Sequence, residues 1–266
     1  MTNSVKIAVL GLGEEAGAIA GALAAAGADV IGFDTAKIKR PPVELAQSAE
    51  AAVAEADLVL SLNSSSVAAR TAQSVAAALK PGAVYADLNA GTPAQKRKLA
   101  GLLPAGAFVD VALLKPVTEA ALPIDCEAAG EAADRLAQHL RPLGMNVTVV
   151  SATPGDAAAR NLIRSLYAKG SAAVIADTLW AAKSMGLEAW AIEAIRGEFD
   201  AGNAQTVQNY LDDTGKHPKR HSVAMTDVVE MLSESNYDST LVNGIGLTFS
   251  HIMHGRKIPF ADLSDN

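Results

Sequence analysis

The chain has 266 residues, half of them apolar, which is enough for one large hydrophobic core or two smaller ones. The formal net charge is −7 and basic residues form no dense patch, so we do not expect nucleic acid as a partner. No stretch reaches about 18 uninterrupted apolar residues, so we expect no membrane span. The one cysteine, Cys126, cannot form an internal disulfide and the first residues lack the pattern of a secretory signal, so a reducing cytoplasm is expected.

Strand and helix patterns alternate over the first 150 residues. Strands are predicted at 5–10, 28–33, 57–62, 83–86, 108–113 and 146–150, and helices at 14–26, 43–54, 67–79, 93–102 and 127–140. This spacing is typical of βαβ units. We therefore expect an α/β domain over residues 1–152, with a doubly wound, mostly parallel sheet of the Rossmann type.

Only helices are predicted after Val150. Thr153 and Pro154 carry the residue types of a helix start, and nothing clearly ends that helix before about Met185. Further helices are predicted at 188–197, 203–212, 219–234 and 239–254. We expect residues 153–266 to form an all-α domain, joined to the first domain by this long helix.

A glycine-rich segment follows the first strand. Gly11 permits a tight turn, Gly13 lets backbone approach a pyrophosphate, and Ala16 is small enough for close helix–strand packing. The helix that starts here offers free N–H groups to an anion, and the carboxylates of Glu14 and Glu15 should point outward. The pattern predicts a dinucleotide phosphate site built from Gly11, Leu12, Gly13, Glu14, Glu15 and Ala16.

Asp34 ends the second strand, where a carboxylate binds the ribose hydroxyls of NAD and repels a 2′-phosphate. Lys37, Lys39 and Arg40 follow directly and would bind such a phosphate, or form a solvated loop. The cofactor is therefore NAD or NADP, with a slight preference for NAD. We also expect Asn63 and Ser64, which follow the third predicted strand, to contact it.

Three segments together resemble the β-hydroxyacid dehydrogenase superfamily, which includes the 6-phosphogluconate dehydrogenase-like NAD(P) oxidoreductases and the imine reductases. They are GLGEEAGAIAGAL near the N-terminus, ADLNAGTP at 86–93 and PGDAAARNLIRSLYAKG at 154–170. The resemblance implies a Rossmann domain, a helical domain, a cleft between them and a homodimer. It further implies a small-molecule substrate and an NAD(P)-dependent oxidoreductase.

The resemblance also implies which segments hold substrate. A hydroxyl pair of the family is replaced here by Asn89 and Ala90, beside Gly91, although this segment also reads as a loop in which Thr92 caps the next helix. Lys115 follows the fifth predicted strand, where it would hold an anionic group or act as an acid, or simply face solvent.

In the third segment, the acid–base lysine of the family falls on Asn161. An asparagine amide polarises a carbonyl but does not shuttle a proton, which leaves the proton donor open. Ser165, one turn later, matches a position near substrate, whereas Lys169 lies too far along the helix to replace the lysine.

His217 matches a family position at a helix start and would bind substrate, or belong to a basic surface loop. We expect no metal site. The leading hypothesis is a hydride-transferring enzyme for a small hydroxy acid, carbonyl or imine, with Asn161, Lys115 and Ser165 at its catalytic centre. The alternatives are an imine reductase-like enzyme and a dinucleotide-binding protein without catalysis.

Overall fold

The computed structural model describes residues 4–118 and 121–261. Contacts within the chain define two compact units, Met1–Ser165 and Leu166–Asn266. The division falls inside the long helix α6 (Asp156–Ser184), whereas the sequence places a domain boundary at 152/153. That boundary stays a prediction.

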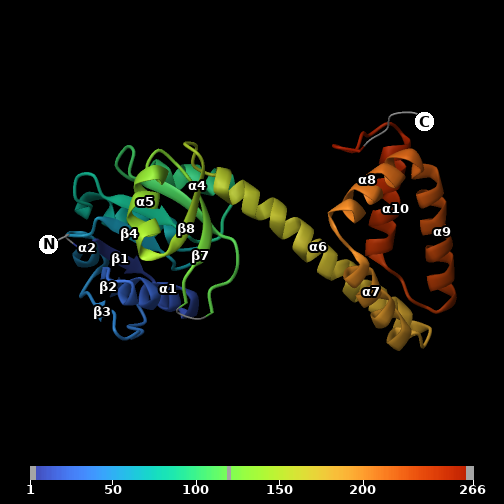
Figure 1. Cartoon of the computed structure of the whole chain (residues 1–266), viewed down its shortest axis with the longest axis horizontal. Coiled ribbons are helices and arrows are strands. Elements are labelled where there is room, and N and C mark those ends of the chain that lie inside the picture. The colour runs from blue at the N-terminus through green and yellow to red at the C-terminus, as the bar shows by residue number, and fades with distance from the viewer. Residues whose placement is uncertain (1–3, 119–120, 262–266) are drawn as a thin grey trace. The chain divides into compact units, whose positions relative to one another are not determined.

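The first unit contains an eight-stranded sheet with the strand order β3-β2-β1-β4-β5-β6-β7-β8 (Figure 1). Every neighbouring pair is parallel except β6 and β7. The expected Rossmann-type, mostly parallel sheet is therefore confirmed. The strands are β1 (Lys6–Leu10), β2 (Asp29–Phe33), β3 (Glu44–Leu45), β4 (Leu58–Ser61), β5 (Val84–Asp87), β6 (Phe108–Leu113), β7 (Ile124–Ala129) and β8 (Met145–Ser151).

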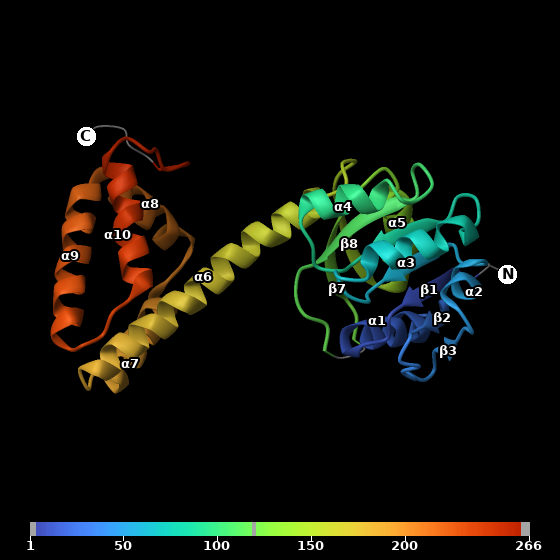
Figure 2. The ribbon, with the colours of Figure 1, turned by 180° about the vertical axis from the view of Figure 1, so that it is seen from behind.

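Helices cover both faces of this sheet because successive strand residues point to opposite sides. Ile7 and Val9 pack in a core with α1 (Glu14–Ala25) and α5 (Ala133–Leu140). Ala8 and Leu10 pack in a second core with α2 (Ala49–Val53), α3 (Ala68–Val75) and α4 (Pro93–Ala100). Helix α5 lies in front of the sheet in Figure 1, and α3 lies in front of it in Figure 2.

The chain reverses its direction of winding between β1 and β4. β1 pairs with β2 on one side and with β4 on the other, so the loops after β1 and β4 leave the same edge of the sheet in opposite directions. In open α/β sheets the crevice at such a switch point binds ligands.

The second unit is helical, as expected. Helix α6 (Asp156–Ser184) runs into it and is followed by α7 (Glu188–Ala201), α8 (Ala204–Lys216), α9 (Pro218–Glu234) and α10 (Thr240–Met253). None of the helices within the described ranges is both long and apolar enough to cross a membrane.

Three predicted elements were wrong in extent. The helix expected at 43–54 is confined to α2 because residues 44–45 pair with β2 and Ser48 caps a new helix start. The helix expected at 127–140 begins only at Ala133, because residues 124–129 form β7 and Gly130 has a φ of +137°. Helix α6 begins two residues later than expected, after Gly155 with a φ of +104°.

We predict that Leu60→Ala will lower the free energy of unfolding by about 2–5 kcal/mol, because this side chain is 1% exposed in a central strand and its loss leaves a cavity. Leu102→Ala is the control, because Leu102 is 36% exposed and should cost about 1 kcal/mol or less. Denaturant titration of both variants measures the difference. Equal losses would contradict the assigned core.

Candidate functional site

The turn after β1 requires a glycine at position 11. Gly11 has a φ of +92°, and its N–H donates to the Phe33 carbonyl at 2.8 Å. A Cβ on Gly11 would lie 2.6 Å from the Leu62 carbonyl oxygen, which is closer than atoms pack. The absent side chain therefore lets the backbones after β1 and β4 touch at the switch point.

Gly13 precedes α1 and has a different constraint. Its φ is −55°, and a Cβ there would meet nothing within 4 Å. Within the described part of the chain no side chain caps α1, whereas Ser48 caps α2 and Thr92 caps α4. The N–H groups of its first turn therefore remain available to an anion, together with the positive end of the helix dipole.

Glu15 does not simply point outward as expected. One of its carboxylate oxygens accepts a hydrogen bond from the Val117 N–H at 3.0 Å, across 102 residues of sequence. Glu15 thus ties the first turn of α1 to the segment after β6.

A hollow of about 650 Å³ opens beside the glycine-rich turn. Five predicted cofactor residues line it: Gly11, Gly13, Asp34, Asn63 and Ser64. Leu12 and Ala16 do not line the hollow. Both are buried and pack in the core that contains α1 and α5. The structure therefore brings the ends of β1, β2 and β4 together around one space.

Asp34 has two backbone partners in this hollow. Its Oδ2 accepts from the Leu12 N–H and its Oδ1 from the Ala36 N–H, both at 2.7 Å. The carboxylate thus fixes the glycine-rich loop as well as facing the hollow. Each oxygen retains a second lone pair with which to accept from a hydroxyl group.

The basic residues after Asp34 do not line the hollow as a group. Arg40 donates from Nε to the Leu12 carbonyl at 3.2 Å and lies against Gly17, where a Cβ would come within 2.7 Å of it. Among the described residues, the cation that lines the hollow is Arg70, in the first turn of α3. Sequence reasoning missed Arg70; its only signal is its place just after Asn63 and Ser64.

The predicted substrate segment after β5 is held by hydrogen bonds to other groups of the protein. The Asn89 amide nitrogen donates to Asp87 Oδ1 at 2.6 Å and to Ser61 Oγ at 3.2 Å. Ala90 is exposed and Gly91 half-buried, and Thr92 caps α4 in a capping box with Gln95. Thr92 thus has the capping role that the sequence left open.

Lys115 is exposed in the segment after β6. It lines a separate hollow of about 220 Å³ with Val117, Pro123 and Asp125, and none of these residues lines the hollow at the glycine-rich turn. Lys115 therefore lies outside the hollow at the glycine-rich turn.

Asn161 and Ser165 are half-buried and one turn apart in α6. The Asn161 side-chain oxygen accepts from Arg164 at 3.2 Å. The neighbouring Arg160 forms an ion pair with Glu127 of β7 at 3.4 Å. The first contact lies within α6, and the second joins the first turns of α6 to the sheet of the same unit.

His217 lies in the second unit, where it is exposed between α8 and α9. The adjacent Arg220 binds both oxygens of Asp213, and this hydrogen bonding holds the pKa of Asp213 below its ordinary value. His221 lies 2.9 Å from the same carboxylate and stacks on Phe249. Much of the basic segment around His217 is therefore engaged within its own unit.

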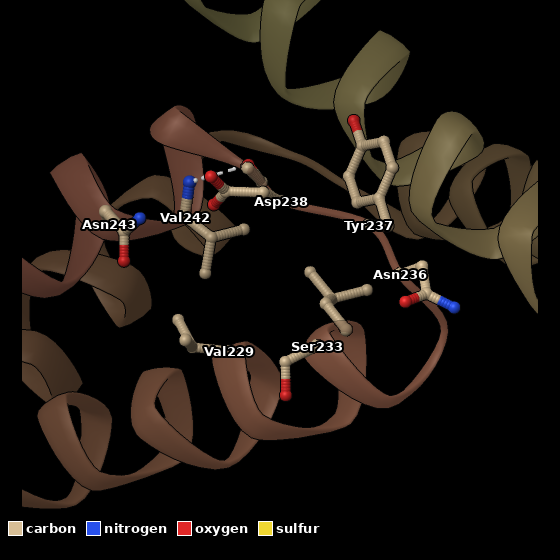
Figure 3. A pocket seen from close by; sticks show the side chains of 9 residues that line it. Val229, Ser233, Asn236, Tyr237, Asp238, Val242 and Asn243 are labelled. Atoms are coloured by element: carbon tan, nitrogen blue, oxygen red, sulfur yellow. Dashed lines mark hydrogen bonds between the residues drawn. The ribbon is translucent and has the colours of Figure 1, made fainter.

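A further hollow of about 330 Å³ lies between α9 and α10 (Figure 3). Tyr237 and Ser239 stand at its edge and donate to the two oxygens of Asp177 at 2.6 and 2.5 Å. The bond to Asp177 raises the pKa of Tyr237, so this phenol is a poorer proton donor than a free tyrosine.

The described residues contain no cluster of three or more histidine, cysteine or acidic side chains suited to a metal ion. Cys126 is buried in β7, and burial raises the pKa of its thiol to about 12. At neutral pH this thiol is therefore not a nucleophile.

Comparison with known proteins agrees with this geometry. Residues 6–112 match the NAD binding domain of 6-phosphogluconate dehydrogenase, and this range holds the glycine-rich turn and all the residues found to line the hollow beside it. An uncharacterised 28.5 kDa protein of Methanothermus fervidus is 22% identical over 169 residues. That alignment covers 64% of this chain and 66% of the relative, slightly less than two thirds of its length.

Two solved structures extend the likeness to nearly the whole chain. A conserved protein of unknown function, described as similar to 3-hydroxyacid dehydrogenases, is 26% identical with a TM-score of 0.63, over 94% of this chain and 97% of that one. An imine reductase variant from Myxococcus stipitatus, solved with NAD⁺, is 15% identical with a TM-score of 0.79, over 94% of each chain. The same organism's imine reductase has also been solved with NADP⁺.

The match over residues 6–112 and these neighbours confirm the expected resemblance: residues 6–112 are similar to the NAD binding domain of 6-phosphogluconate dehydrogenase, and the chain shares its fold with an imine reductase and with a protein described as similar to 3-hydroxyacid dehydrogenases.

Proposed function

We propose that this protein is an NAD(P)-dependent oxidoreductase that transfers hydride to or from a small carbonyl, imine or hydroxy acid. The observation that carries the proposal is the hollow at the switch point, bounded by Gly11, Gly13 and Asp34 beside the uncapped start of α1. The cofactor would supply the hydride. The chain's own residues would bind its phosphates, orient it and hold the substrate.

The phosphates belong at the first turn of α1, where free N–H groups converge. Asp34, Asn63 and Ser64 face the same hollow and would bind the nucleoside portion. Asp34 favours NAD over NADP because a 2′-phosphate would meet its negative charge. Arg70 lines the same hollow and would favour the phosphate, so the preference for NAD is a small one.

Asn161 favours an imine substrate over a hydroxy acid or a carbonyl compound, because carbonyl reduction needs the same acid–base group as the reverse oxidation. Its amide holds a polar group by hydrogen bonding but does not take the proton that an alcohol releases when it is oxidised. An imine that is already protonated when it binds needs no proton donor from the protein for hydride transfer. We therefore keep imine reduction as the second candidate, and binding without turnover as the third.

We further propose that the protein works as a homodimer. Within the described residues of the second unit, the buried apolar side chains are Ala182, Ala191 and Leu232. Large apolar side chains are exposed there instead, among them Trp190 at 69%, Tyr210 at 61% and Leu247 at 63%. Burying so few apolar side chains does not offset the conformational entropy that a unit of this size loses on folding. A second copy of the chain would cover the exposed apolar side chains.

The first test is dinucleotide binding. Gly13→Ala should cost about 1 kcal/mol or less of stability, because its backbone is unstrained and the space is open. It should nevertheless weaken NADH binding by about tenfold or more, because the methyl group stands where the pyrophosphate approaches. Calorimetric titration with NADH and NADPH measures both affinities, and we expect NADH to bind more tightly.

Gly11→Ala is the matched comparison for this test. Its positive φ and its contact with Leu62 should cost about 1–3 kcal/mol of stability before any ligand is added. If the unmodified protein binds none of NAD⁺, NADH, NADP⁺ and NADPH, the proposed function fails.

The second test concerns the reaction. The unmodified protein should oxidise NADH or NADPH with members of a panel of cyclic imines, and act poorly on small carbonyl compounds and hydroxy acids. Asn161→Lys should raise hydroxy-acid oxidation by about 100-fold or more, the range that a positioned acid–base group contributes. Asn161→Ala should show no such gain. No turnover with any compound, despite tight cofactor binding, would favour the non-catalytic alternative.

The third test is the mass in solution. The unmodified protein should elute near twice the chain mass of 27.3 kDa in light-scattering chromatography. Trp190→Lys together with Leu247→Lys should shift it toward the monomer and reduce its stability, because two charges would enter the apolar contact. Asp200→Lys, an exposed charge change in α7, should leave the mass unchanged. A monomeric unmodified protein would refute the dimer.

A further inference from the structure

A buried lysine lies beneath the segments assigned to the substrate. Lys96 of α4 is 2% exposed, and its Nζ donates to three oxygens. They are the Asp87 carbonyl at 3.0 Å, Asp87 Oδ2 at 2.8 Å and the Asn89 carbonyl at 2.7 Å. An ammonium group is costly to bury unless it is paired and fully bonded, and here each N–H has an acceptor. Lys96 therefore has no free proton with which to replace the missing lysine of α6.

Two carboxylates face this ammonium. Asp87 ends β5, Asp110 lies opposite it in β6, and Asp110 Oδ1 is 3.2 Å from Lys96 Nζ. The other oxygen of each carboxylate reaches a different segment. Asp87 Oδ1 accepts from the Asn89 side chain at 2.6 Å, and Asp110 Oδ2 accepts from the Ala158 N–H in the first turn of α6 at 2.8 Å. One buried charge cluster thus touches both the loop after β5 and the start of α6.

A separate contact joins the same two regions. A Cβ on Gly155 would lie 2.8 Å from the Pro93 carbonyl oxygen and 2.9 Å from its Cα. The backbone just before α6 is therefore packed directly on the first residue of α4, which carries Lys96 one turn later. Only a residue without a side chain, with its φ of +104°, fits this approach.

We propose that Lys96 is a positioning residue that holds the loop after β5 in a fixed place relative to the first turns of α6. Asn89 belongs to that loop, and Asn161 follows Ala158 by one helical turn, so the two candidate substrate residues are set by the same ammonium group. The substrate role of Asn89 and Asn161 rests on the proposed function. The coupling of the two segments does not, and is tested without any substrate.

Lys96→Met tests the coupling because it keeps the length of the side chain and removes its charge and donors. Hydrogen–deuterium exchange should become about tenfold faster at the amides of Leu88, Thr92 and Ala158, whose N–H groups are hydrogen-bonded in these segments. NADH affinity should stay within about twofold, because residues 11–16 are untouched. The control is Lys80→Met, which removes an ion pair of 2.5 Å to Asp57 at the opposite end of β4 and should leave both segments protected.

A double variant separates positioning from simple neutralisation. Lys96→Met with Asp87→Asn neutralises one of the two buried carboxylates that lose their cation, so the melting temperature should recover part of the way toward that of the unmodified protein, with Asp110 still unpaired. The amides of Leu88 and Thr92 should still exchange fast, because nothing donates to the Asn89 carbonyl. Full recovery of protection in the double variant, or unchanged exchange in Lys96→Met, would overturn the proposal. Where the panel yields a substrate, kcat should fall in both variants while the KM for NADH holds. Failure to bind NADH at all would count against the proposed function and not against this coupling.

Discussion

The organisation of the first unit depends on the close approach of two backbones at Gly11. The N–H of Gly11 closes the turn onto the end of β2, while its missing side chain admits the backbone that leaves β4. The carboxyl ends of β1, β2 and β4 therefore lie close together, and α1 begins directly after this turn. A side chain at this position would separate the strands that form the hollow. The missing side chain of Gly11 therefore permits both the close packing of the two backbones and the hollow that a ligand would enter.

The acidic residues at the carboxyl edge of the sheet have two different kinds of partner. Just after β2, the carboxylate of Asp34 accepts hydrogen bonds from backbone N–H groups. At β5 and β6 two carboxylates share a buried ammonium and fasten the neighbouring segments. Backbone donors leave a carboxylate with its charge and spare lone pairs, whereas an ion pair uses them internally. The first arrangement suits a residue that faces a ligand, and the second suits one that supports others.

The fold could be predicted from the sequence where local signals and tertiary packing agree. The apolar strands 5–10 and 57–62, the turn at Gly11 and the cap at Thr92 each have a local cause. Prediction was wrong at residues 44–45 and 124–129, because these short strands form only through pairing with a neighbour that a single segment does not reveal.

The site was harder to predict for a related reason. Lys96 sits in the polar run PAQKRKLA, which is typical of a solvated helix face, and its burial depends on Asp87 and Asp110 from two other elements. Arg70 and the bond from Val117 to Glu15 likewise arise from residues far apart in sequence. Spacing predicts which residues leave the same sheet edge, but not which of them use their polar atoms on each other. The roles of Asn89, Lys115, Asn161, Ser165 and His217 remain proposals for the same reason.

The two bonds of Asp34 constrain any redesign of cofactor choice. Exchanging this aspartate for a neutral or basic residue would remove the repulsion of a 2′-phosphate, but it would also release the Leu12 amide that the carboxylate now holds. A substitution chosen only for its charge would change the cofactor selectivity but would also disturb the conformation of the glycine-rich loop. Engineering would have to begin with a side chain that keeps an acceptor oxygen at that amide, such as asparagine, and add the positive charge from elsewhere, with Arg70 already in the same hollow.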